Sequence, residues 1–142
     1  LFDHTSKDGT KYDSRKRSIY LPVIRNNLYD VFQLFDATDA TVLDGNRATT
    51  VVAPQALFML NSELVLAASK SLAEQVTVET ASPPQRIEQM YLRAYGRPPT
   101  GQEVSRATAY VEKMRAAGKS EVEAWTSLGH VLLSANEFIY LR

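Results

Sequence analysis

Cysteine is absent from the 142-residue chain. That absence excludes disulfide bonds, thiolate zinc sites, iron–sulfur clusters and covalent haem attachment within this sequence. An excess of charge is also missing, because 16 basic residues balance 16 acidic ones, and the chain has no global field to draw it to nucleic acid or to an anionic membrane. No run of roughly 18 apolar residues occurs, so the sequence predicts no membrane-spanning segment. A hydrophobic content of 44% with 23% charged residues is typical of a soluble globular domain.

Recognisable catalytic motifs are lacking as well. The serines form no G-x-S-x-G or S-x-x-K motif, and the six glycines are scattered rather than collected in a phosphate-binding loop. Of the two histidines, His4 lies in a polar N-terminal stretch and His130 lies in an expected helix. For His130 a partly buried imidazole that meets a carbonyl or water is favoured over a metal ligand. The sequence therefore predicts no catalytic, cofactor-binding or metal residue and leaves enzyme status open.

The N-terminal third begins with a mainly polar stretch that carries no helical period, so we interpret residues 1–16 as a lead-in from a preceding module. The basic run at 14–17 favours a solvated surface over a nucleic-acid site. Residues 17–25 are rich in β-branched and aromatic side chains around Pro22, which favours an extended arm or an edge strand. Asn26 and Asn27 then occupy the N-cap position of a short first helix. Its expected apolar face comprises Leu28, Val31, Phe32 and Phe35.

A helix that starts at Pro54 is expected to form the centre of the core, because proline suits the first helical turn. Asn61 and Ser62 interrupt its pattern, and Ser62 is expected to cap a second helical segment. The two segments are expected to share one apolar stripe, which comprises Leu57, Leu60, Leu64, Ala68, Leu72 and Val76.

The C-terminal half contains the clearest helix signals. A helix is expected to start at the serine and two prolines of positions 82–84 and to stop at Gly96. Two capping-box patterns, Thr100 with Glu103 and Ser120 with Glu123, start the next two helices. The expected buried residues of these three helices are Ile87, Met90, Tyr91, Ala94, Val104, Ala107, Val111, Met114, Val122, Trp125, Leu128 and Leu132.

Together these signals predict a mainly α fold, a compact bundle of about five helices with an extended N-terminal arm, in a single domain over residues 17–142. The large apolar and aromatic groups at positions 138–141 are expected to pack back onto this bundle. Arg97, at the corner between two helices, is expected to pair with an acid or a backbone carbonyl.

Polar residues of the loop before and at the start of the central helix form the best candidate site. They are Asp36, Asp39, Asp44, Arg47, Thr49, Thr50 and Gln55. Clustered carboxylates and amides suit a hard cation such as calcium, although the alternation of an EF-hand is absent. The alternative is structural: Asp36 caps a helix end, Arg47 pairs with an acid, and the remaining side chains satisfy backbone groups.

A second polar cluster lies near the C-terminus, where Asn136 and Glu137 precede Phe138. A carboxylate and an amide beside aromatic rings can hydrogen-bond a sugar. The alternative is again structural, with Asn136 at a helix end and Phe138 as an apolar anchor.

Several segments, taken in order, resemble a known family. They are RSIYLPVIRN, FDATD, NRATTVVAPQALFMLN, RIEQMYLRAYGRPPTGQE and WTSLGHVLLSANEFIYLR. The order resembles the planctomycete-type C-terminal domain of unknown function (family 1553), over residues 17–142. The chain departs from the family pattern at residues 36–39, where the family usually has a proline, and at Ala53, where it has a threonine. The resemblance implies no catalytic residue.

The resemblance also implies a setting. Members of the family end large exported proteins that often carry a planctomycete cytochrome c-like domain, so the resemblance implies a periplasmic or cell-surface location, with any haem held by an upstream domain. The expected function is a helical structural or interaction module that packs on other domains of the same polypeptide or on another exported protein. One alternative is a carbohydrate- or calcium-binding module centred on residues 36–55, with a polysaccharide as partner. The other is an accessory part of an enzyme whose active site lies upstream.

Overall fold

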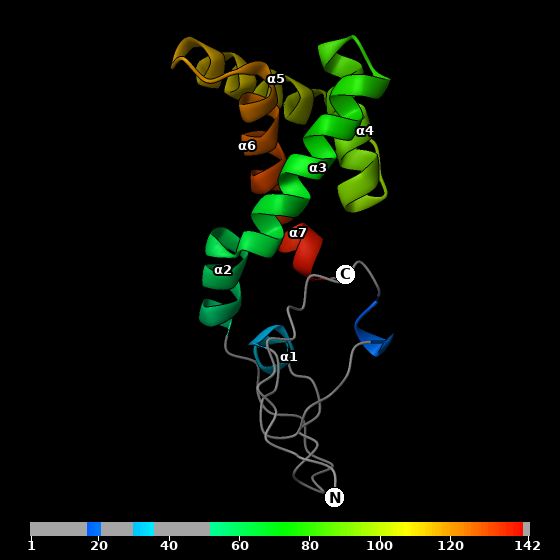
Figure 1. Cartoon of the computed structure of the whole chain (residues 1–142). Coiled ribbons are helices and arrows are strands. Elements are labelled where there is room, and N and C mark those ends of the chain that lie inside the picture. Colours follow the sequence, from blue (N-terminus) through cyan, green and yellow to red (C-terminus); the bar gives the residue numbers. More distant parts are fainter. Residues whose placement is uncertain (1–16, 21–29, 36–51, 141–142) are drawn as a thin grey trace, which may run out of the picture. The chain divides into compact units, whose positions relative to one another are not determined.

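The computed structural model describes residues 17–20, 30–35 and 52–140 (Figure 1). By their internal contacts the residues fall into two compact units, Leu1–Gln55 and Ala56–Arg142. Every regular element in the three described ranges is helical, and five helices are ten residues or longer. The predicted mainly α fold of about five helices is therefore confirmed. The predicted boundary between residues 16 and 17 stays a prediction.

The first unit contributes two short elements to the described part of the chain. Ser18–Tyr20 form one turn of 3-10 helix (η1), closed by a hydrogen bond of 2.9 Å from the Tyr20 amide to the Arg17 carbonyl. This turn differs from the extended backbone expected there, and the rest of the expected arm lies outside the described residues. The predicted first helix is present as α1 (Asp30–Leu34), with Val31, Phe32 and Phe35 half-buried.

The second unit is built from long helices. Helix α2 (Val52–Asn61) leads into this unit and is followed by α3 (Glu63–Glu79), α4 (Pro83–Tyr95), α5 (Gly101–Ala116), α6 (Glu121–Leu133) and the short α7 (Asn136–Ile139). Helix α3 lies along α6, and α4 and α5 complete the packing around them (Figure 1).

The ends of α3 to α6 lie close to where the local sequence signals place them, whereas α2 begins at Val52, two residues before the expected start at Pro54. The Ser62 hydroxyl accepts a hydrogen bond of 3.2 Å from the Leu64 amide and so caps α3. Both predicted capping boxes form, at Thr100 for α5 and at Ser120 for α6. Gly96 ends α4 with a φ of 69°, a left-handed conformation that favours glycine. These ends depend on side chains within one turn, which is why the sequence alone predicted them.

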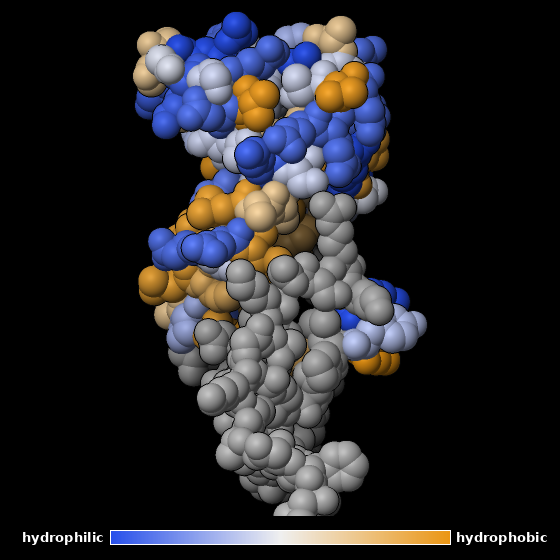
Figure 2. Space-filling model, viewed as in Figure 1, coloured by the Kyte–Doolittle hydropathy of each residue, from blue (hydrophilic) through white to orange (hydrophobic). Residues whose placement is uncertain are grey.

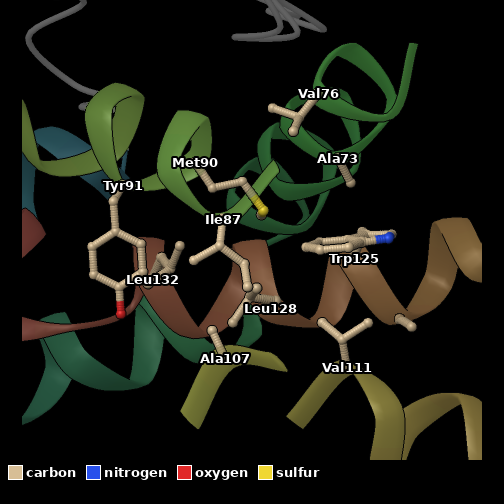
Figure 3. Packing of buried hydrophobic residues seen from close by; sticks show 11 residues of the cluster. Ala73, Val76, Ile87, Met90, Tyr91, Ala107, Val111, Trp125, Leu128 and Leu132 are labelled. Carbon is tan, nitrogen blue, oxygen red and sulfur yellow. The ribbon is translucent and has the colours of Figure 1, made fainter. Parts of the chain in front are cut away.

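The hydrophobic core lies between α3, α4, α5 and α6. Ile87 and Met90 of α4 are completely buried and point towards α6, where Trp125 and Leu128 meet them (Figure 3). Val111 closes the cluster from α5. The buried faces predicted for α4, α5 and α6 are therefore confirmed in their main members.

The predicted stripe along α2 and α3 is wrong for most of its residues. Leu57, Leu60 and Leu64 are 62%, 56% and 48% exposed, Ala68 is exposed, and only Val76 is fully buried. A bend of 53° separates the two segments, so they do not continue one face. The residues that α3 does bury are Val65, Ser69, Ala73 and Val76.

The physical reason is a close crossing of α3 and α6. A Cβ atom placed on Gly129 would lie 3.2 Å from the Ser69 carbonyl oxygen and 3.3 Å from the terminal methyl of Met90. Ser69 is completely buried at this point and donates its hydroxyl to the Val65 carbonyl at 2.7 Å. Small residues on both helices, rather than the leucines, therefore determine which side of α3 faces the core.

Residues 138–140 near the C-terminus are less buried than expected. Phe138 and Tyr140 are 41% and 38% exposed, and Ile139 is half-buried.

Within the described ranges no single helix has both the length and the apolar composition to cross a membrane. The α2 and α3 segments reach that length and composition only when they are added together across their bend.

Candidate functional site

The predicted polar site is only partly visible in the described residues. Six of its members lie outside them: Asp36, Asp39, Asp44, Arg47, Thr49 and Thr50. Gln55, Asn136 and Glu137 are described. In the part of the chain that the structure describes, no group of three or more histidine, aspartate or glutamate side chains is arranged to hold a metal ion. The calcium hypothesis for residues 36–55 therefore stays a prediction.

Gln55 has a structural contact of the kind that the alternative interpretation expects. Its side chain is 3% exposed, and its amide nitrogen donates a hydrogen bond of 2.7 Å to the carbonyl of Leu34. That carbonyl belongs to the last turn of α1, where helix carbonyls lack partners within the helix. Gln55 therefore ties the start of α2 to the end of α1.

Glu137, from the second predicted cluster, is part of an ion-pair network. Arg97, in the corner between α4 and α5, donates to both carboxylate oxygens of Glu137 at 2.6 and 2.9 Å and to both of Glu103 at 2.7 and 3.0 Å. Its guanidinium also lies 5.7 and 5.6 Å from the ring centres of Tyr91 and Tyr95. The pairing predicted for Arg97 is confirmed, and it fastens α7 to the α4–α5 corner.

The electrostatics of this network follow from its geometry. Hydrogen bonds from Arg97, followed by the backbone hydrogen bond from Thr100, lower the pKa of Glu103 to about 2. Burial is the main cause that raises the pKa of Tyr95 to about 12, and its hydroxyl donates to the Leu132 carbonyl at 3.0 Å. The hydrogen bonds to Glu103 and Glu137 raise the pKa of the Arg97 guanidinium. Both carboxylates bind the same guanidinium, so Arg97 links the start of α5 to α7.

Replacing Glu103 with glutamine is expected to reveal this ion pair through pH. Glutamine keeps one acceptor oxygen for the capping box, but it loses the charge and one of the two oxygens that accept from Arg97. We expect it to lower the free energy of unfolding at pH 7 by about 1 kcal/mol or less. Because the folded-state pKa is lowered from 4.5 to about 2, the contribution is complete above pH 4.5 and is lost as the pH falls through 2.

The measurement is the difference in melting temperature between the original chain and Glu103→Gln from pH 7 to pH 2. The difference should shrink over the lower half of this range and disappear near pH 2. Glu112→Gln is the control, because Glu112 lies on the same helix and has no ion pair in the described part of the chain. A difference that stays constant with pH would contradict the assignment.

His130 occupies the environment predicted for it. It is half-buried in α6, and its Nε2 atom lies 3.2 Å from the carbonyl oxygen of Met59. The Ser134 hydroxyl donates to the same carbonyl at 3.0 Å. Met59 precedes the end of α2, where the carbonyls have no helical partner. The two side chains therefore hold the end of α2 against α6.

Arg86 is a buried charged residue that the sequence interpretation missed. It is 8% exposed, its Nε atom donates to the Thr80 carbonyl at 2.7 Å, and one terminal nitrogen donates to Glu121. Its guanidinium lies 5.5 Å from the ring centre of Trp125. The only feature of the sequence that points to its burial is its position directly before Ile87, next to the buried face of α4. The partners come from α3 and α6, and the sequence offers no sign of them.

Exposed apolar side chains lie on both sides of the bend between α2 and α3, and we call Leu57, Leu60, Leu64 and Ala68 together the exposed leucine face. Figure 2 shows hydrophobic side chains collected over α2 and the first part of α3. Residues 51–69 contain a single charged residue, Glu63. Contiguous apolar surface of this kind marks contact sites for proteins or membranes more often than scattered exposed leucines do.

Comparison with known proteins gives one match. A family model described as PSD1, protein of unknown function (DUF1553), matches residues 2–111. This range begins earlier than the segments in which we found the resemblance and ends within α5. Neither a curated protein nor a solved structure matches the chain.

Proposed function

Since the chain belongs to the DUF1553 family of proteins of unknown function, we propose that it is an interaction module, which packs its exposed leucine face against the apolar helix surface of a neighbouring protein domain. In this proposal the neighbour is another domain of the same exported, planctomycete-type polypeptide or a second exported protein. The observation that carries the proposal is that Leu57, Leu60 and Leu64 are 48–62% exposed in a stretch that contains a single charged residue.

Two further observations support a protein as the partner. Leu57 and Leu60 lie three residues apart on α2, a spacing that suits packing against another helix, and Leu64 lies beyond the bend at the start of α3. The described polar clusters, by contrast, are engaged in the fold: Arg97 pairs with Glu103 and Glu137, and Gln55 holds the carbonyl of Leu34. The apolar face is therefore the surface with the most to gain from a partner, because burial of a leucine side chain contributes about 1.5–3 kcal/mol.

Photocrosslinking from the exposed leucine face tests this proposal. We would place the photocrosslinker benzoylphenylalanine at position 57 in the full-length polypeptide that contains the chain, and identify the crosslinked peptide by mass spectrometry. The proposal expects a crosslink to an apolar helix of a protein domain. The double change Leu60→Lys and Leu64→Lys should reduce its yield at least tenfold, because two charges then oppose burial.

Controls separate loss of docking from loss of folding. Leu92→Lys, at a position that is 38% exposed on α4, should leave the crosslink unchanged. The lysine variants should keep the melting temperature of the chain, because exposed positions rarely change the free energy of unfolding by more than about 0.5 kcal/mol. Crosslinks only to lipid, or an equal yield with the two lysines present, would refute a protein partner.

The two alternatives from the sequence remain separate hypotheses. Calcium or carbohydrate binding would be centred on residues 36–55, and a stability increase with either ligand that Asp36→Ala abolishes would establish it. An accessory role in an upstream enzyme would show as lost activity of the parent protein when this chain is deleted.

A further inference from the structure

A pocket of about 280 Å³ lies between the beginnings of α4 and α6 and the second half of α5. Arg86, in the wall of the pocket, donates a hydrogen bond to the carbonyl of Thr80, which directly follows α3. The pocket therefore lies near the C-terminal end of α3, whereas the exposed leucine face lies at its N-terminal end. A cavity of roughly 150 Å³ holds one benzene ring, so the pocket has room for one or two apolar side chains. Its lining residues are Pro83, Pro84, Arg86, Thr108, Val111, Glu112, Arg115, Glu121 and Trp125.

The wall combines apolar surface with the buried side chain of Arg86. Most of the wall is apolar, and it is formed in part by the two prolines, Val111 and Trp125. Arg86, with a side chain that is 10% exposed, uses Nε and Nη1 for Thr80 and Glu121. Its Nη2 atom has no hydrogen-bond partner among the described residues. A buried donor of this kind favours an occupant that brings an acceptor.

The charges around the pocket exclude strongly charged ligands as good occupants. Arg86 and Arg115 contribute two positive charges, and Glu112 and Glu121 contribute two negative ones. Arg86 is already neutralised by Glu121, so an anion would gain little from it and would meet Glu112 nearby. A neutral acceptor can take the free donor without this repulsion.

The position of the tryptophan argues against a sugar-stacking platform. Trp125 is 3% exposed, and the Arg86 guanidinium lies 5.5 Å from its ring centre. Flat stacking of a sugar requires an open ring face, and this face carries the arginine. The pocket therefore offers a mainly apolar recess beside the buried guanidinium of Arg86.

We propose that this pocket binds a peptide segment of a partner protein by enclosing one apolar side chain while the free Nη2 atom of Arg86 donates to a backbone carbonyl of that segment. The peptide supplies both required groups, a neutral apolar side chain and an uncharged acceptor. This site is distinct from the exposed leucine face, and either proposal can fail without the other.

Trp125 makes the test direct, because it is the single tryptophan of the chain and it lines the pocket. We would titrate the 142-residue protein with the blocked peptides Ac-Ala-Leu-Ala-NH2 and Ac-Ala-Ala-Ala-NH2, and separately with glucose and with acetate, and follow tryptophan emission. The leucine peptide should give a saturable change with a Kd on the order of 1 mM, typical of a ligand that buries one side chain. The alanine peptide should bind at least tenfold more weakly.

A pair of variants on α5 controls for location. Thr108→Phe fills the pocket and should abolish the change in tryptophan emission with the leucine peptide. Ala109→Phe places the same ring at an exposed neighbouring position and should keep the Kd for this peptide within twofold of the original. Amide chemical-shift changes in the original protein provide the same information without a variant. They should concentrate at Thr108, Glu112 and Trp125.

Three outcomes would overturn the proposal. The first is an equal response to the leucine and alanine peptides, and the second is saturable binding of glucose or acetate in place of the peptide. The third is a set of shift changes that avoids the pocket residues. Loss of binding in the folded Thr108→Phe variant alone, together with the leucine preference, would establish the site.

Discussion

Replacing Gly129 with leucine is expected to lower the free energy of unfolding by about 3 kcal/mol or more. The reason is the close approach of α3, where a Cβ atom at this position would already lie 3.2 Å from the backbone oxygen of Ser69. The methyl of Met90 can move aside, but the backbone of α3 cannot do so without opening the core. Leucine adds three carbon atoms beyond the Cβ, so the two helices must separate.

The measurement is urea denaturation followed by the helical circular dichroism signal. The Gly129→Ala variant should have nearly the same free energy of unfolding as the original chain. The higher helix propensity of alanine adds up to about 1 kcal/mol, and the tight contact of its Cβ atom costs a similar amount. Gly101→Leu is the matched control, since nothing lies within 4 Å of a Cβ at that position. If Gly129→Leu were as stable as Gly101→Leu, the close crossing of α3 and α6 would be wrong.

Replacing Trp125 with alanine is expected to lower the free energy of unfolding by about 3–5 kcal/mol. Trp125 is 3% exposed and belongs to the cluster that joins α3, α4, α5 and α6. Its removal leaves a large cavity, and it also takes away the ring beneath the guanidinium of Arg86, which lies 5.5 Å from the ring centre. The buried arginine then has to find solvent or another partner.

Circular dichroism is again the right probe, because this variant has no tryptophan fluorescence. Val131→Ala on the same helix is the control: Val131 is 51% exposed, and its truncation should cost no more than about 0.5 kcal/mol. If Trp125→Ala lowered the free energy of unfolding no more than Val131→Ala does, α6 would not pack through the face that carries Trp125. The pair therefore tests the orientation of α6 about its own axis.

Part of the candidate site could be predicted from sequence, and the rest could not. The corner position of Arg97 indicated a pairing role, which its bonds to Glu103 and Glu137 confirm. Arg86 gave no such sign, because its partners Thr80 and Glu121 are 6 and 35 residues away along the chain. The sequence does not show whether a charged side chain is solvated or buried. Arg86 is buried because α6 packs against it in the folded chain.

The sequence by itself determined helices α3 to α6, the caps that start or end them, and the faces that α4, α5 and α6 bury. Those features depend on caps, glycine and proline positions, and on periodicity within a single helix, all of which act over a few residues. The tertiary structure alone decided which side of α3 is buried. There the small residues Ser69 and Gly129 allow a close crossing with α6, and Leu64 stays exposed. The bend at Ser62 separates α3 from α2, where Leu57 and Leu60 are exposed as well. Hydrophobic periodicity reports how apolar each face is, whereas helix packing depends on how closely two backbones can approach.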